Sequence, residues 1–150
     1  MTRVSRGGPP VKLEPEIRLF LEQPRYAVLA TVYPGGAPHL TEMWYELRGD
    51  EIIFNTTEER TKKRNLEADA RASIHVSARK GDPTWARPSY VRVEGTVRRI
   101  ATGKEALEEI VALSIRYDGP ESEADARATF AHAHRVTYAL TIERVYPKGL

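Results

Sequence analysis

The chain has 150 residues, of which 41% are hydrophobic and 29% charged, and this balance predicts one soluble globular domain. It contains no cysteine, which excludes disulfides, a thiolate nucleophile and every cysteine-ligated metal site. The net charge is only +2, no apolar run approaches the roughly 20 residues that span a bilayer, and no secretory signal is visible, so we expect a cytoplasmic protein without nucleic-acid or membrane partners.

Hydrophobic periodicity predicts six strands and four helical segments along the chain. Residues 1–12 are interpreted as a flexible arm rich in Gly and Pro, and residues 13–150 as the single domain. The expected strands are 25–33, 39–47, 51–56, 72–78, 89–100 and 135–146. The expected helices are 14–23, 57–69, 102–117 and 123–132, the third opened by a capping box of Thr102 and Glu105.

The connections between the first strands decide the fold class. Turns at Pro34–Ala37 and Arg48–Asp50 are too short for the crossovers that parallel strands need, so the first three strands form an antiparallel meander. The pattern therefore predicts a mainly β protein, a small six-stranded antiparallel barrel with peripheral helices. An open antiparallel α+β sheet is the alternative.

Familiar catalytic motifs are absent from the sequence. There is no Gly-x-Gly-x-x-Gly, P-loop, His-Glu-x-x-His or Gly-x-Ser-x-Gly. His132 and His134 either share a strand face as metal ligands or lie exposed at a helix end, and the second interpretation is favoured. We therefore predict no metal site and identify no catalytic acid or base.

The most informative segment runs from Asn55 to Leu66. A strand ends in Thr56 and Thr57, and four cations then fall within five residues around a helix start, namely Arg60, Lys62, Lys63 and Arg64. Helix N-termini carry free N–H groups and a positive partial charge, so hydroxyls and cations placed there predict a phosphate cradle. The alternative is an ordinary solvated helix face whose cations pair with nearby acids, namely Glu58, Glu59 and Glu67.

Several short motifs resemble a known group of proteins. The segment Ala27–Thr31, the turn from Pro34 to Pro38 and the strand end Met43-Trp44-Tyr45 resemble the flavin-binding split β-barrel group. That group includes pyridoxamine-phosphate-oxidase-like proteins and deazaflavin (F420)-dependent oxidoreductases. The most specific match is Arg60-x-Lys62-x-Arg64-Asn65-Leu66 with Ala70-Arg71-Ala72-Ser73, which is similar to R-x-K-x-R-N-L…D-P-R-x-S of the F420-using branch, with Ala70 in place of proline.

The resemblance implies a six-stranded split β-barrel that forms a homodimer with two cofactor sites at the interface. It implies that Arg60 and Lys62 bind the cofactor phosphate and that the strand from His39 to Met43 lies against the cofactor ring. Trp44 either borders that ring or belongs to a core or interface. The alternating charges of Arg92, Glu94 and Arg98 are a further reason to expect a dimer. The predicted cofactor-binding residues are His39, Leu40, Thr41, Met43, Asn55, Thr56, Thr57, Arg60, Lys62 and Lys63.

The resemblance further implies an F420-dependent reductase that transfers a hydride between the deazaflavin and a small conjugated organic substrate. One alternative is an FMN-dependent, pyridoxamine-phosphate-oxidase-like oxidoreductase, because FMN and F420 share a tricyclic ring, a ribityl chain and a phosphate. Another is a non-catalytic flavin- or tetrapyrrole-binding protein. In each enzyme the ring performs the hydride chemistry, so the protein needs no dedicated acid or base.

Overall fold

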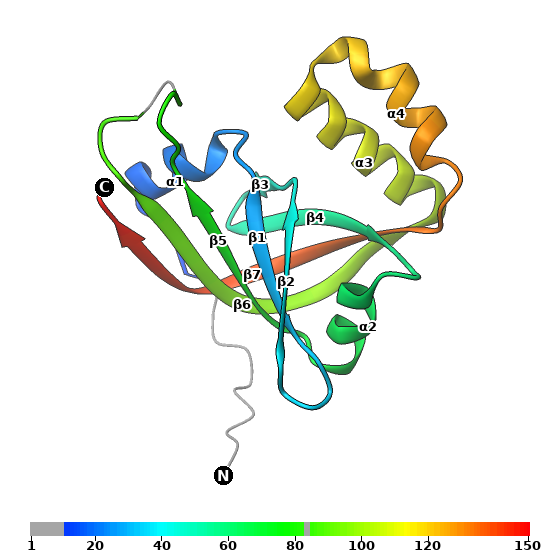
Figure 1. Cartoon of the computed structure of the whole chain (residues 1–150), viewed down its shortest axis with the longest axis horizontal. Helices are drawn as coiled ribbons and strands as arrows, with labels where there is room; N and C mark the ends of the chain where they lie inside the picture. Colours follow the sequence, from blue (N-terminus) through cyan, green and yellow to red (C-terminus); the bar gives the residue numbers. More distant parts are fainter. Residues whose placement is uncertain (1–10, 83–84) are drawn as a thin grey trace.

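The computed structural model describes residues 11–82 and 85–150, so residues 1–10 of the expected N-terminal arm lie outside the described residues. The fold is built around seven strands, with the helices at its periphery (Figure 1). They are β1 (Ala27–Val32), β2 (Pro38–Met43), β3 (Glu46–Arg48), β4 (Glu51–Thr57), β5 (Arg71–Ser77), β6 (Tyr90–Thr102) and β7 (Arg135–Lys148). The helices are α1 (Pro15–Glu22), α2 (Thr61–Ala68), α3 (Gly103–Asp118) and α4 (Glu123–Phe130), with a 3-10 turn at Pro120–Ser122.

The prediction of six strands is wrong by one, because the expected strand 39–47 is interrupted at Trp44 and Tyr45. Its first half, β2, pairs with β1, whereas its second half, β3, pairs with β4. At the break the Tyr45 N–H donates to the Tyr117 hydroxyl (3.1 Å) instead of joining a ladder. The Tyr45 ring is fully buried, and its hydroxyl donates to the Leu21 carbonyl (2.8 Å), which fixes the bend.

The strands form one antiparallel sheet in the order β2-β1-β5-β6-β7-β4-β3. Because the single segment 38–48 supplies both end strands, its bend joins the two ends of the sheet, an arrangement that fits a split barrel. The core consists of inward-facing residues from all the long strands, including Leu29, Phe54, Ile74 and Leu140. The prediction of an antiparallel, mainly β fold with peripheral helices is confirmed.

The helices cover different parts of the sheet. α1 packs against β3, and α2 packs against β1 and β4. α3 and α4 lie side by side, with α3 over β7 (Figure 1). Thr102 is the N-cap of α3 as expected, but its side chain makes no capping hydrogen bond, so the predicted capping box does not form. Within the described residues, no helix combines the length and the apolar character needed to cross a membrane.

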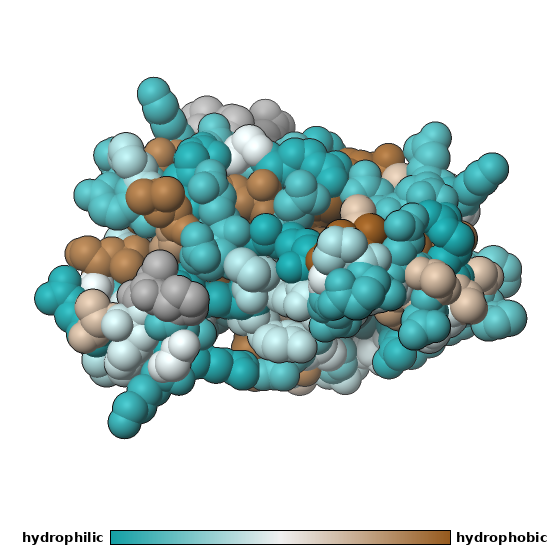
Figure 2. All heavy atoms as spheres, turned by 90° about the horizontal axis from the view of Figure 1, so that it is seen from above, coloured by the Kyte–Doolittle hydropathy of each residue, from teal (hydrophilic) through white to brown (hydrophobic). Residues whose placement is uncertain are grey.

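The charges on β6 that suggested a dimer have partners within the chain. Arg92 pairs with Glu94 (2.9 Å), and Arg98 pairs with Glu51 on β4. These charges therefore give no argument for pairing across a two-fold axis, and the homodimer stays a prediction. On the face shown in Figure 2, hydrophobic residues form several separate groups between hydrophilic ones.

Candidate cofactor-binding site

Helix α2 is held on the sheet by two adjacent residues of its last turns. Asn65 is 2% exposed, and its amide donates to the Thr31 hydroxyl on β1 (3.1 Å). Leu66 is buried in the core. These anchors set the position of the first turn, where Arg60 is the N-cap and Lys62 follows. The Asn-Leu pair of the sequence motif therefore anchors α2, and the preceding cations lie at the start of the helix.

Most of the acids that were candidates for pairing with the cations of α2 are engaged elsewhere. Glu59 contacts His134 (3.2 Å), and Glu67 contacts Arg99 (2.5 Å). Glu58 pairs with Lys63 (2.9 Å), so the alternative of an ordinary paired helix face holds for Lys63. Across residues 11–82 and 85–150, no acidic side chain forms an ion pair with any of the other three cations, namely Arg60, Lys62 and Arg64.

Lys62 is a partly buried cation in a positively charged neighbourhood. Burial lowers the pKa of the Lys62 ammonium group, and the nearby cations Arg60 and Arg135 lower this pKa further. Burial and Arg60 likewise lower the pKa of the Arg135 guanidinium. A protein pays a free-energy cost to hold cations together in this way, and a bound anion offsets that cost. The cluster of Arg60, Lys62 and Arg135 is called the cation cluster below.

Arg135 is the member of the cation cluster that the sequence analysis missed. It begins β7 and lies directly opposite Thr57 in the β4–β7 register. In the sequence it is the first residue of the expected closing strand, 75 positions after Arg60. Arg135 lies beside the helix start because the strand that ends at Thr57 pairs antiparallel with the closing strand. Predicting that pairing would have been needed to find Arg135 from the sequence.

Several predicted residues have buried polar atoms without a hydrogen-bond partner. These atoms are His39 Nδ1, Thr41 Oγ1 and Thr56 Oγ1, together with Nε of Arg135. Thr56 is 3% exposed. Buried polar atoms in proteins nearly always have partners, and a missing partner costs about 1–3 kcal/mol. These atoms lie on β2, at the end of β4 and at the start of β7, so each is a candidate to meet a polar group of a bound cofactor.

The other predicted residues occupy varied environments. The Asn55 amide is buried and donates to the Ala106 carbonyl and the Thr137 hydroxyl (both 2.9 Å), so it also ties β4 to α3 and β7. Met43 belongs to the core, whereas Leu40 on the same strand is 64% exposed. His39 lies edge-on to the Tyr33 ring, with 5.3 Å between ring centroids.

Arg99 on β6 joins the acids around α2 into one network. Its Nη1 donates to Glu58 (2.8 Å) and its Nη2 to Glu67 (2.5 Å), and the Tyr138 hydroxyl also donates to Glu67 (3.0 Å). The network fastens the C-terminal end of α2, through Glu67, and the turn before the helix, through Glu58, to the sheet. It also keeps two carboxylates engaged away from Arg60 and Lys62, which leaves those cations available.

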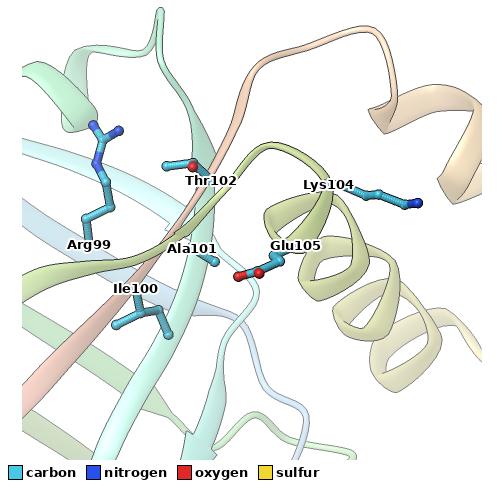
Figure 3. A pocket seen from close by; sticks show the side chains of 6 residues that line it. All are labelled: Arg99, Ile100, Ala101, Thr102, Lys104 and Glu105. Carbon is cyan, nitrogen blue, oxygen red and sulfur yellow. The ribbon is translucent and has the colours of Figure 1, made fainter.

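A hollow of about 490 Å³ lies at the junction of β6 and α3, and Arg99 is one of the residues that line it (Figure 3). Arg99 points toward α2, whereas Lys104 points away from it. None of the predicted cofactor-binding residues lines this hollow. Its lining residues are Arg99, Ile100, Ala101, Thr102, Lys104 and Glu105.

Aromatic side chains connect the bend after β2 with the α3–α4 pair. Trp44 is partly exposed and stacks on Tyr117 of α3, with 5.4 Å between ring centroids. Phe130 of α4 meets Trp44 edge-on (6.4 Å), and the Arg135 guanidinium lies 4.5 Å from the Phe130 ring centroid. The aromatic row thus leads from Trp44 to the cation cluster.

Residues 13–148 match the family model described as pyridoxamine 5'-phosphate oxidase. The chain belongs to this family. A solved structure of a conserved hypothetical protein, Rv2991 from Mycobacterium tuberculosis, is 30% identical with a TM-score of 0.73, covering 92% of this chain and 85% of that one. A structure named F420 reductase is 29% identical with a TM-score of 0.67, covering 86% of this chain and 94% of that one.

A more distant protein with the same fold is named for a different role. The heme storage protein HutZ from Vibrio cholerae is 18% identical with a TM-score of 0.67, covering 93% of this chain and 97% of that one. At this identity the likeness concerns the fold alone. The predicted resemblance to the pyridoxamine-phosphate-oxidase-like split barrels is confirmed, and with it the broad class of flavin-binding oxidoreductase folds.

Proposed function

We propose that this protein is an F420-dependent reductase that transfers a hydride between the deazaflavin and a small conjugated organic substrate. The observation that carries the proposal is the cation cluster, which has no acidic ion-pair partner within the described residues and which includes Arg135 opposite Thr57 at the end of β4. The 29% identity to a structure named F420 reductase favours the deazaflavin over FMN.

The residues of the chain divide into two groups in this proposal. Arg60 and Lys62 bind the phosphate, with Thr56 and Thr57 at the end of β4 beside them and Lys63 holding Glu58 away. The strand from His39 to Thr41, which includes Leu40, lies against the ring through its backbone and side chains. Met43 supports that strand from the core, and Asn55 ties β4 to α3. The bound ring supplies the hydride chemistry, while the protein binds it, orients it and excludes water.

We also propose a homodimer in which a second copy covers the ring site. β2 is an end strand of the sheet, and Leu40 on it is 64% exposed. A large exposed apolar side chain on the free edge of an end strand is typical of surfaces that another chain covers. A second copy placed there would also exclude water from a cofactor that lies against β2.

FMN dependence is the nearest alternative, because the cation cluster recognises a phosphate and not the tail that distinguishes F420. The test is a parallel titration of the protein with F420 and with FMN, followed by assays with reduced cofactor and a panel of conjugated acceptors. We expect tighter binding of F420 and acceptor-dependent consumption of the reduced form. Tighter binding of FMN would reverse the cofactor assignment, and tight binding without turnover across the panel would favour a binding protein.

A further inference from the structure

The side chain of Arg135 is held in place by its neighbours, but its hydrogen-bond donors are not all paired. Its guanidinium lies over the Phe130 ring at 4.5 Å, and its Nη1 donates to the side-chain Oδ1 of Asn55 at 3.4 Å. Its Nε is buried and has no partner. A hydrogen bond of 3.4 Å is weak, so a small rotation of the guanidinium toward a better acceptor sacrifices little.

The position of Arg135 places it beside the two cations expected to bind phosphate. It faces Thr57 across the β4–β7 ladder, three residues before Arg60. The positive charges of Arg60 and Arg135 both lower the pKa of Lys62, and the charge of Arg60 also lowers the pKa of Arg135. Glu59 has the opposite effect and raises the pKa of Arg135, but its carboxylate contacts His134 (3.2 Å).

We propose that Arg135 is a third phosphate-binding cation, contributed by β7 and oriented by Phe130 and Asn55. The proposal rests on the proposed function, since it concerns the same site. A guanidinium presents parallel N–H donors that match two phosphate oxygens, which a lysine cannot imitate. Three cations together suit a ligand that carries more than one negative charge at this point. A phosphate monoester dianion carries two such charges, and so does a phosphodiester with an adjacent carboxylate.

The stacking of Phe130 on Arg135 links helix α4 to the proposed phosphate site. Phe130 is the last residue of α4, so the α3–α4 pair contributes to the site through Arg135 and not only through packing on the sheet. Phe130 is a positioning residue here, because it holds the guanidinium plane without touching the ligand. Its loss should therefore weaken phosphate recognition less than the loss of Arg135.

The test measures dissociation constants of four variants, Arg135→Ala, Arg135→Lys, Phe130→Leu and the double variant Arg60→Ala/Lys62→Ala. The ligands are F420 and its phosphate-free deazariboflavin core, and FMN and riboflavin. Arg144→Ala is the matched control, because Arg144 is an exposed arginine on the same strand, 3.9 Å from Glu94. Melting temperatures confirm that each variant is folded.

We expect Arg135→Ala to weaken binding of the phosphorylated ligand about 10- to 150-fold, the value of one charge-assisted hydrogen bond, and to leave the phosphate-free ligand unchanged. Arg135→Lys should recover part of the loss, Phe130→Leu should lose a few-fold, and Arg144→Ala should match the wild type. If the double variant loses binding and no Arg135 variant does, Arg135 is not a binding residue and the proposed function stands. If the double variant also binds normally, the proposed function fails as well. Equal losses for phosphorylated and phosphate-free ligands would overturn the role of Arg135 in phosphate recognition.

Discussion

Replacing Arg60 or Lys62 by alanine is expected to weaken binding of the phosphorylated cofactor about 10- to 150-fold, with a larger loss in the double variant. In the proposed site each cation would make a charge-assisted hydrogen bond to the phosphate, worth about 1.5–3 kcal/mol, and about 1.4 kcal/mol corresponds to a factor of ten. The Lys62 contact is the stronger candidate, because its ammonium group is partly buried and a buried charge is less well screened by water. Fluorescence titration with F420 measures the effect.

The same variants should keep their thermal stability in the absence of cofactor. Neither cation has an acidic ion-pair partner in the described part of the chain, and burial together with Arg60 and Arg135 lowers the pKa of Lys62. Removing Lys62 therefore relieves repulsion, so the melting temperature should stay the same or rise. Arg71→Ala is the control, since it removes an exposed arginine paired with Asp69 and should not change cofactor affinity. Unchanged affinity in both single variants and the double variant would remove the phosphate cradle.

Gly95→Ala is expected to destabilise the fold by about 3 kcal/mol or more. Gly95 lies at a register shift between β6 and β7, and a Cβ atom there would stand 1.9 Å from the Thr141 carbonyl oxygen. The clash is with backbone, so the two longest strands must move apart, which costs more than a crowded side chain does. For a chain of this size the melting temperature should fall by about 6–12 °C or more.

Gly35→Ala provides the comparison for that substitution. Gly35 lies in the turn between β1 and β2, and a Cβ atom there meets nothing within 4 Å. Its melting temperature should stay within a degree or two of the wild type, because surface substitutions of this kind change stability by less than about 0.5 kcal/mol. A Gly95→Ala protein that melts with the wild type would show that β6 and β7 are not packed as described.

The fold was largely readable from the sequence because alternating apolar residues and short turns are local signals. The turn at Arg48–Asp50 and the alternation through Val91 and Val93 both predicted the observed strands. The break at Tyr45 was not readable, because residues 39–47 keep the composition of a strand. It depends on the hydroxyl of Tyr117, which is 72 residues away in the sequence.

The site residues that are close together in the sequence could be predicted from it, whereas those that are far apart in the sequence could not. Arg60 and Lys62 stand out because cations are unfavourable at a helix start unless an anion is bound there. Arg135 and Arg99 come from β7 and β6, and only strand pairing brings them to α2. The engagement of Glu58 and Glu67 by Arg99, which leaves Arg60 and Lys62 without acids, required the three-dimensional arrangement.

This chain is proposed to recognise the phosphate of a flavin-like cofactor. Calorimetric titration of the unmodified protein with F420 and with its phosphate-free deazariboflavin core tests this most directly, with FMN and riboflavin as the second pair. Two or more charge-assisted hydrogen bonds to the phosphate predict that the phosphorylated member of the preferred pair binds more than about 100-fold tighter. Equal affinity for the phosphorylated and phosphate-free members of both pairs would contradict the account.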